Sequence, residues 1–143
     1  MKRFENIIIA SDLDGTFMGK DSRIVPRNLE AIRYFKEHGG HFTFATGRTA
    51  DIVLPRIPMA AELLNLPAVT ANGTCLYDFG EKKAMEEYYL PYEVLAQLGA
   101  FFAVEAPDLA MRASSTVGMV AYDIDHPIIH EEYASLSLLP NPI

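Results

Sequence analysis

The sequence predicts an α/β protein built on a parallel sheet, and three observations support this fold class. Residues 5–10, 41–45 and 67–71 form short segments with the length and the apolar, β-branched or aromatic content of strands. The segments between them carry apolar residues at helical spacing. Strands that alternate with helices in this order form parallel sheets with right-handed crossovers. We therefore expect the order β-α-β-α-β up to residue 71.

The first strand leads directly into a group of polar residues. The run Ile7–Ala10 is wholly apolar, which fits a strand buried on both faces. Asp12 and Asp14 follow at its C-terminal end, where open α/β sheets bind their ligands. Residues 17–25 show no clear period, and we expect them to form an exposed flap.

Prolines and glycines mark the ends of the first helices. Pro26 suits the first turn of a helix, which we expect to run to about residue 38 and to end at the two glycines that follow. Thr49 is expected to cap a short helix that begins at Ala50. Pro55 must interrupt or end that helix, because it lacks the N–H that an internal turn requires.

The pattern changes after residue 72. We expect a hairpin, then a helix, two further strands and a last helix, over residues 75–89, 92–104, 108–113, 117–122 and from Pro127 onward. The break at Leu90-Pro91 predicts two parts, residues 1–89 and residues 90–143.

Composition and charge exclude several classes of partner. The 143 residues are half apolar and carry a net charge of −7, which disfavours nucleic acid and an anionic membrane surface as main partners. No stretch approaches the length of a membrane span. Cys75 is the one cysteine, so no internal disulfide can form and we expect a cytoplasmic protein.

Asp12 and Asp14 suit phosphoryl transfer. Alternate residues leaving a strand can point the same way, so both carboxylates can face one pocket. Asp12 could attack phosphorus as a nucleophile, and Asp14 could protonate the leaving alcohol and then activate water. Mg2+ would neutralise charge between carboxylate and phosphate. Gly15 would permit a tight turn, and Thr16 would steady the loop by hydrogen bonds.

The ends of the next two strands carry matching groups. Thr46 stands just before a helix, where a hydroxyl and free N–H groups together suit a phosphate. Gly47 permits close approach, and Arg48 offers a charged donor. Asn72-Gly73 is read in two ways, as part of the site or as a hairpin turn.

These segments resemble the haloacid dehalogenase superfamily. The resemblance lies in Asp-Leu-Asp-Gly-Thr over residues 12–16 and Ala-Thr-Gly-Arg over residues 45–48. Ala-Asn-Gly-Thr over residues 71–74 is similar to the Cof-type (cap class IIB) sugar-phosphatase branch. The implied fold is a Rossmann-like parallel core with helices on its faces, followed by an α/β cap.

The resemblance also implies roles for individual residues. It implies Asp12 as nucleophile and metal ligand, and Asp14 as acid/base and as metal ligand through its main chain. The implied phosphate-binding residues are Leu13, Gly15, Thr46, Gly47 and Arg48, and those near the substrate are Thr16, Asn72 and Gly73. The implied cofactor is Mg2+, and the implied substrate is a small phosphorylated metabolite such as a sugar phosphate.

The sequence departs from the family pattern in its second part. The family's later lysine and its Gly-Asp-x-x-Asn-Asp type segment are not recognisable. We therefore expect the first half of the core, residues 1–89, and part of the cap, residues 90–143. The family arrangement makes the first strand central, so loss of the later strands would turn Ile7–Ala10 into an exposed apolar edge. We expect that edge to produce a homo-oligomer.

Two functions remain open at this point. The first is a Mg2+-dependent phosphomonoester hydrolase that works through an aspartyl-phosphate. The second is a non-catalytic phosphate- or metal-binding fragment, or one that acts in assembly, and the missing lysine and acidic segment motivate it.

Overall fold

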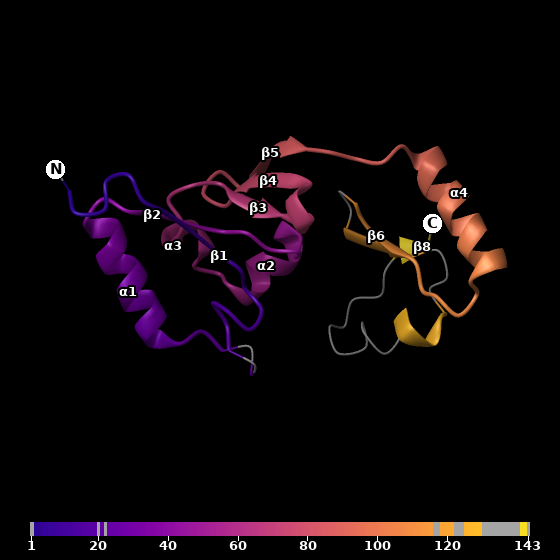
Figure 1. Ribbon diagram of the computed structural model, residues 1–143, viewed down its shortest axis with the longest axis horizontal. Helices are drawn as coiled ribbons and strands as arrows, with labels where there is room; N and C mark the ends of the chain where they lie inside the picture. The colour runs from indigo at the N-terminus through magenta and orange to yellow at the C-terminus, as the bar shows by residue number, and fades with distance from the viewer. Residues whose placement is uncertain are drawn as a thin grey trace. The chain divides into compact units, whose positions relative to one another are not determined.

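A computed structural model describes residues 2–19, 21, 23–115, 118–121, 125–129 and 141–142 (Figure 1). The chain divides into two compact units, Met1–Tyr88 and Tyr89–Ile143. Unit 1 contains β1 (Ile8–Ser11), α1 (Pro26–Glu37), β2 (His41–Phe44), α2 (Ala50–Arg56), α3 (Ala60–Leu63), β3 (Ala68–Thr70), β4 (Cys75–Asp78) and β5 (Lys83–Glu87). Unit 2 contains α4 (Tyr92–Glu105), β6 (Arg112–Ser115), β7 (Gly118–Ala121) and β8 (Asn141–Pro142). The mixed α/β class predicted from the sequence is confirmed.

The neighbouring strands of unit 1 lie side by side in the same order as they occur in the sequence. β1 and β2 are parallel, with Ile8 opposite His41 and Ser11 opposite Phe44. A parallel bridge between Ala45 and the middle of β3 places β3 beside β2. β3, β4 and β5 then pair antiparallel. The parallel part of the sheet, which the alternation of strands and helices predicts, ends at β3.

Aromatic side chains form much of the core of unit 1. Phe42 and Phe44 of β2 are buried, and Phe35 of α1 is buried with them. Phe17 is also buried, and its ring centroid lies 5.1 Å from that of Phe44. The expectation of an exposed flap is therefore wrong for Phe17 and for Met18, which is also buried. Burial of these apolar side chains draws the start of the segment onto β2, although its sequence has no period.

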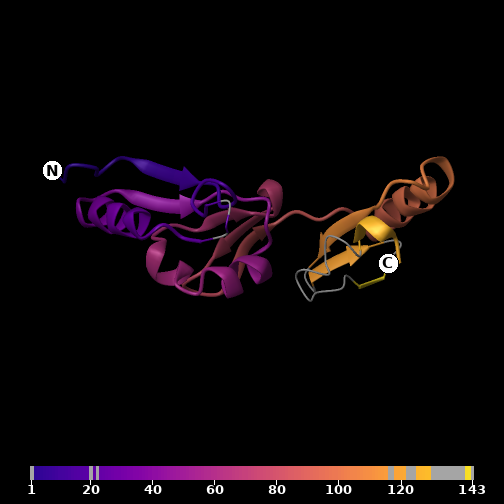
Figure 2. The same ribbon diagram turned by 90° about the horizontal axis from the view of Figure 1, so that it is seen from below.

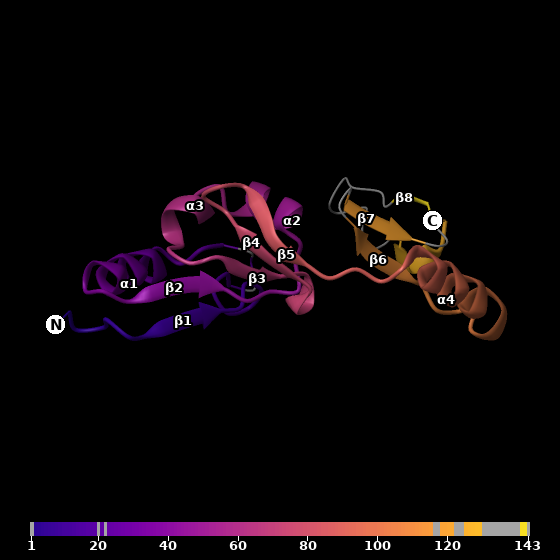
Figure 3. The same ribbon diagram turned by 90° about the horizontal axis from the view of Figure 1, so that it is seen from above.

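β1 differs from its expected environment. Ile7, Ile8 and Ile9 are 46%, 63% and 43% exposed, so the prediction of a strand buried on both faces is wrong. Among the described residues β1 pairs with β2 alone. Figures 2 and 3 show it on the outside of unit 1, with β2 between it and the rest of the sheet. The exposed apolar edge expected for residues 7–10 is present.

Prolines, a glycine and Thr49 stand at or near the ends of the first two helices. α1 begins with Pro26 and stops after Glu37, where Gly39 has a φ of +92°. Thr49 occupies the N-cap of α2 and the helix begins at Ala50, as expected, but the Thr49 hydroxyl makes no capping hydrogen bond. Pro55 lies inside α2, and the helix ends one residue later at Arg56.

Unit 2 has the predicted helix but a shifted strand. α4 ends one residue beyond its predicted end. β6 starts at Arg112 and not at residue 108, because a turn in which Leu109 N donates to Ala106 O occupies the preceding residues. The continuation of the last predicted helix beyond Ile129 lies outside the described part of the chain. Among the described helices, none has the length and apolar character needed to cross a membrane.

Candidate active site

The side chain of Leu13 anchors the loop after β1 in the core of unit 1. Leu13 is fully buried in the core, and its carbonyl accepts a hydrogen bond from Met18 N at 2.8 Å. Gly15 has a φ of +76°, a conformation that glycine adopts without strain. The loop therefore turns tightly around Leu13 and leaves Asp12 and Asp14 exposed. Only the main chain of Leu13 is free to face a ligand.

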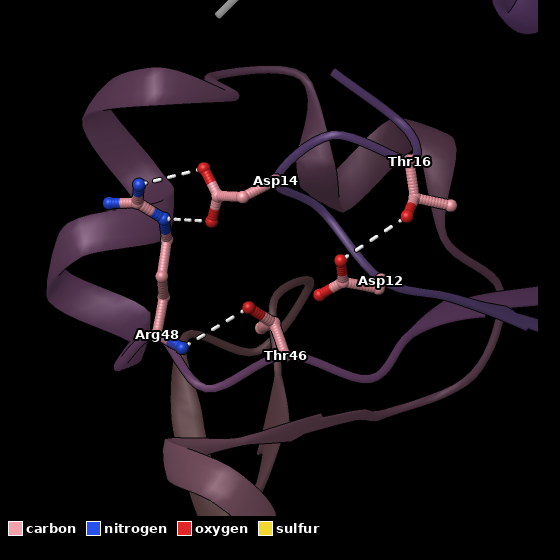
Figure 4. A network of polar contacts seen from close by, with 5 residues as sticks. All are labelled: Asp12, Asp14, Thr16, Thr46 and Arg48. Carbon is pink, nitrogen blue, oxygen red and sulfur yellow. Dashed lines mark hydrogen bonds and ion pairs between the residues drawn. The ribbon is translucent and has the colours of Figure 1, made fainter. Parts of the chain in front are cut away.

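Asp12 is held by a neighbour on its own loop. The Thr16 hydroxyl donates to Asp12 Oδ2 at 3.3 Å, which is the steadying contact expected of Thr16. The Asp12 carboxylate points into the space between the loops that follow β1 and β2 (Figure 4). The described residues give Asp12 no salt bridge. Its second oxygen can therefore act on a ligand.

Thr46 lies at the end of β2, next to β3. Its main-chain N–H donates to Val69 O at 2.9 Å, and its side chain is buried. Its hydroxyl oxygen accepts a hydrogen bond from the main-chain N–H of Arg48 at 3.1 Å. Figure 4 shows Thr46 pointing toward the same space as Asp12. The carboxyl ends of two neighbouring parallel strands thus bring a carboxylate and a hydroxyl together.

Arg48 joins the two loops through Asp14. Arg48 Nε donates to Asp14 Oδ2 at 2.5 Å, and Nη2 donates to Oδ1 at 2.7 Å (Figure 4). These hydrogen bonds hold the pKa of Asp14 below its ordinary value, against the opposing effect of partial burial. They raise the pKa of Arg48 for the same reason. In the free chain, Arg48 therefore neutralises one of the two carboxylates.

Arg56 is a residue near the site that the sequence analysis missed. It is the last residue of α2, the helix that starts directly after the Thr46–Thr49 loop. Its charge acts on Asp14, lowering the pKa of that carboxyl. Burial lowers the pKa of Arg56, and the positive charge of Arg48 lowers it further. The signal that could have found it is the length of α2, two turns, which returns residue 56 to the side of the helix that residue 49 occupies.

Asn72 lies against the loop after β2. Its main-chain N–H donates to Thr46 O at 3.2 Å. A Cβ on Gly47 would lie 2.7 Å from Asn72 Oδ1, so any larger residue at position 47 would require the Asn72 side chain to move aside. Asn72 and Gly73 also form the left-handed turn between antiparallel β3 and β4, with φ of +56° and +94°. The two sequence interpretations are therefore compatible, because the hairpin turn lies beside the site loop.

Comparison with known proteins assigns the chain to a family. Residues 9–136 match the haloacid dehalogenase-like hydrolases. The chain belongs to this family. Escherichia coli pyridoxal phosphate phosphatase YbhA is 34% identical over 91 residues, which are 64% of this chain and 33% of YbhA. Bacillus subtilis 5-amino-6-(5-phospho-D-ribitylamino)uracil phosphatase YwtE is 38% identical over 72 residues, which are 50% of this chain and 25% of YwtE.

Solved structures support the haloacid dehalogenase-like fold. A haloacid dehalogenase-like hydrolase from Bacteroides thetaiotaomicron superposes with a TM-score of 0.70 at 22% identity, over 96% of this chain and 51% of that chain. A sugar phosphatase of subclass IIB superposes with a TM-score of 0.73 at 21% identity, over 96% of this chain and 52% of that chain. The chain thus spans about half the length of these structures and a quarter to a third of the two curated relatives.

The site of this haloacid dehalogenase-like chain offers oxygen ligands suited to Mg2+. The Asp12 carboxylate and the main chain of Asp14 are hard oxygen donors, and Mg2+ commonly binds through one or two carboxylates while keeping several waters. Within the ranges that the structure describes, no group of three His, Cys, Asp or Glu side chains gathers as a metal site. The donor set fits Mg2+ in its chemistry and would supply part of a coordination shell.

The structure brings most of the predicted site residues to one place. Asp12, Asp14 and Thr16 lie on the first loop, and Thr46 and Arg48 lie on the second (Figure 4). Gly47 and Asn72 are in contact range of each other at the edge of the second loop. Leu13 contributes no side chain, because that side chain belongs to the core.

Proposed function

We propose that this chain carries the phosphoryl-transfer part of a Mg2+-dependent phosphomonoester hydrolase that acts on small phosphorylated metabolites such as sugar phosphates. The observation that supports this most is the convergence of Asp12 and Thr46 between two loops at the carboxyl ends of β1 and β2. Membership of the haloacid dehalogenase-like hydrolases and the phosphatase names of the relatives agree with it.

In the proposed reaction, Asp12 is the nucleophile. The free oxygen of its carboxylate forms a bond to phosphorus, and the ester P–O bond breaks. A bound phosphoryl group that draws Arg48 away leaves Asp14 free to take up a proton from solvent, and the oxygen of the leaving alcohol takes that proton as the P–O bond breaks. Water then attacks the aspartyl-phosphate and gives a proton to Asp14, which releases inorganic phosphate and restores the Asp12 carboxylate.

Thr46 and Arg48 are proposed to hold the phosphoryl group. The Thr46 hydroxyl can donate to a phosphate oxygen while it continues to accept from Arg48 N. The Arg48 guanidinium binds Asp14 in the free chain, and a phosphoryl group between the loops is a second ligand for the same donors. The Asp12 carboxylate and the Asp14 carbonyl would hold Mg2+, whose charge offsets the repulsion between carboxylate and phosphate.

A second function, phosphate binding without turnover, is favoured by one observation. Both oxygens of Asp14 are engaged by Arg48, and Asp14 is the proposed acid and base. A chain that binds phosphate through Thr46 and Arg48 but keeps Asp14 in this ion pair would act as a binding or assembly module.

Hydrolysis of an aryl phosphate tests the first function. Purified chain with Mg2+ and p-nitrophenyl phosphate is expected to release nitrophenolate, and Asp12→Asn is expected to abolish the release. Asp21→Asn is the matched control, because Asp21 is an exposed aspartate whose partner is Arg23. Turnover no higher than that of Asp12→Asn would contradict the catalytic proposal.

Binding of inorganic phosphate separates the two functions. Calorimetry with phosphate in the presence of Mg2+ is expected to detect binding to the wild type that Thr46→Val weakens. Binding without turnover of p-nitrophenyl phosphate would favour the binding module, and absence of both would contradict both functions.

A further inference from the structure

The turn at the end of β3 has a backbone conformation that its residues do not favour. Ala71 and Asn72 have φ of +51° and +56°, in the left-handed region. Residues with a Cβ seldom adopt this region, because the Cβ crowds a neighbouring carbonyl oxygen, and alanine lacks the polar side chain with which asparagine compensates. Strain of this kind persists only where the surrounding structure holds it. Contacts of this turn with the rest of unit 1 must therefore offset the strain.

The main chain of this turn donates to the loop after β2. Ala71 N donates to Arg48 O at 2.9 Å, and Asn72 N donates to Thr46 O at 3.2 Å. Successive N–H groups of an extended strand point to opposite sides, so a strand could direct only one of these two groups at the loop. The left-handed conformation turns both N–H groups toward it. The two hydrogen bonds together form a clamp on the loop after β2.

The two carbonyls in the clamp belong to the residues that bring polar groups to the site. Thr46 presents a hydroxyl, which accepts a hydrogen bond from Arg48 N at 3.1 Å. Arg48 presents a guanidinium, which reaches Asp14 on the loop after β1 (Figure 4). Gly47 stands between them and has no side chain that could pack against the core. The orientation of this loop therefore depends on contacts made through its main chain.

We propose that Ala71 and Asn72 are positioning residues, whose main-chain N–H groups orient Thr46 and Arg48 toward a phosphoryl group. Each acts through the carbonyl that it holds and needs no contact with the substrate. Because a misplacement of about 1 Å can cost about a hundredfold in rate, a clamp on both residues bears directly on phosphoryl transfer. This role rests on the proposed function, whereas the two hydrogen bonds of the clamp do not.

Lys82 provides a matched control position. Its φ is +53°, close to that of Ala71, but it lies exposed in the turn between β4 and β5. Valine, a β-branched residue, strongly disfavours the left-handed region, whereas asparagine tolerates it. Ala71→Val and Lys82→Val are therefore expected to lower the unfolding temperature of the chain more than Ala71→Asn and Lys82→Asn do. Circular dichroism of each variant confirms that it folds.

Phosphate binding separates positioning from general strain. In calorimetry with inorganic phosphate and Mg2+, Ala71→Val is expected to bind about tenfold more weakly than the wild type, the effect of one charge-assisted hydrogen bond. Ala71→Asn, whose side chain is similar in size to valine, is expected to restore the affinity. Lys82→Val and Lys82→Asn are expected to bind phosphate equally tightly. A folded Ala71→Val that binds as tightly as Ala71→Asn, or a tenfold loss in Lys82→Val relative to Lys82→Asn, would overturn the proposal.

Amide hydrogen exchange tests the clamp without phosphate. By nuclear magnetic resonance, the amides of Ala71, Asn72 and Arg48 in the wild type are expected to exchange slowly, because each donates a hydrogen bond. In Ala71→Val the amides of Asn72 and Arg48 are expected to exchange faster, and in Ala71→Asn they are expected to stay protected. Unprotected amides at Ala71 and Asn72 in the wild type would overturn the proposal, even if Ala71→Val fails to fold. Protected amides in a chain that binds no phosphate would support the clamp and contradict the proposed function instead.

Discussion

Arg48 and Asp14, from two different loops, form a bidentate ion pair with N–O distances of 2.5 and 2.7 Å. The Arg48 side chain is 27% exposed and the Asp14 side chain 49%, so water weakens the attraction. The pair nevertheless fixes the position of the loop after β1 relative to the loop after β2. The same two loops carry Asp12 and Thr46.

A double-mutant cycle is expected to measure this pair directly. Arg48→Ala and Asp14→Asn, alone and together, should give a coupling free energy of about 0.5–1 kcal/mol, the range of a partly exposed ion pair. Urea unfolding at neutral pH is the measurement. Arg48→Lys is the control, because it keeps the charge but loses the paired donors, and it should retain part of the coupling. A coupling of zero would show that the two side chains do not interact in solution.

The stability of the pair is expected to depend on pH. Arg48 lowers the pKa of Asp14 in the folded chain, so the folded state binds this proton less readily than the unfolded state does. The contribution is fully present above the ordinary carboxyl pKa of about 4 and is lost as the pH falls through the lowered value. The difference in unfolding free energy between wild type and Arg48→Ala should therefore be constant from about pH 7 to 5 and shrink below about pH 4. A difference that grows on acidification would contradict this sign.

Arg56 is expected to contribute to anion binding at the site. Its charge acts on Asp14 and Arg48, and the described residues give it no salt bridge. Arg56→Ala is expected to weaken the affinity for inorganic phosphate by about tenfold, which corresponds to one charge-assisted hydrogen bond. Arg33→Ala on the exposed side of α1 is the control for loss of one positive charge. An equal loss of phosphate affinity in Arg56→Ala and Arg33→Ala would show that Arg56 acts only through the net charge of the chain.

Gly47 and Asn72 are expected to depend on each other. A Cβ at residue 47 would lie 2.7 Å from Asn72 Oδ1, at the end of a side chain that can turn aside, so Gly47→Ala should lower the unfolding free energy by about 0.5–1 kcal/mol. In an Asn72→Gly background the same substitution should cost less, because glycine removes the contact and accepts the φ of +56°. Thermal unfolding of the four proteins measures this. If Gly47→Ala lowers the unfolding free energy equally in the Asn72→Gly background, its strain does not arise from contact with the Asn72 side chain.

Much of the fold of unit 1 follows from local patterns that are complete within one segment. Pro26 and the glycines after α1 predict that helix closely, because a missing N–H and a left-handed backbone act within a single turn. β6 was placed too early although the sequence carries the turn signal: Pro107 and Asp108 occupy the two central positions of the turn in which Leu109 N donates to Ala106 O, and both residue types favour turns. Phe17 was misassigned for a different reason. Its burial depends on Phe44, which is distant in the sequence.

The site shows the same division between local and distant causes. Asp12, Asp14 and Thr46 follow from their position at the ends of strands, which a sequence pattern reveals. The choice of Arg48 for Asp14 could not be predicted, because the spacing of residues does not show which of two nearby acids a flexible side chain selects. The exposure of β1 could not follow from its composition, since an apolar strand looks the same in the centre of a sheet and at its edge.

Detection of the covalent intermediate on Asp12 tests the central claim most directly. The chain is incubated with Mg2+ and a reactive phosphoryl donor such as acetyl phosphate, quenched with hydroxylamine, digested and analysed by mass spectrometry. We expect the hydroxamate modification at Asp12 in the wild type, none in Asp12→Asn, and an unchanged yield in Asp21→Asn. Modification that persists in Asp12→Asn, or a wild type with no modification at Asp12, would contradict its assignment as the phosphoryl-accepting nucleophile.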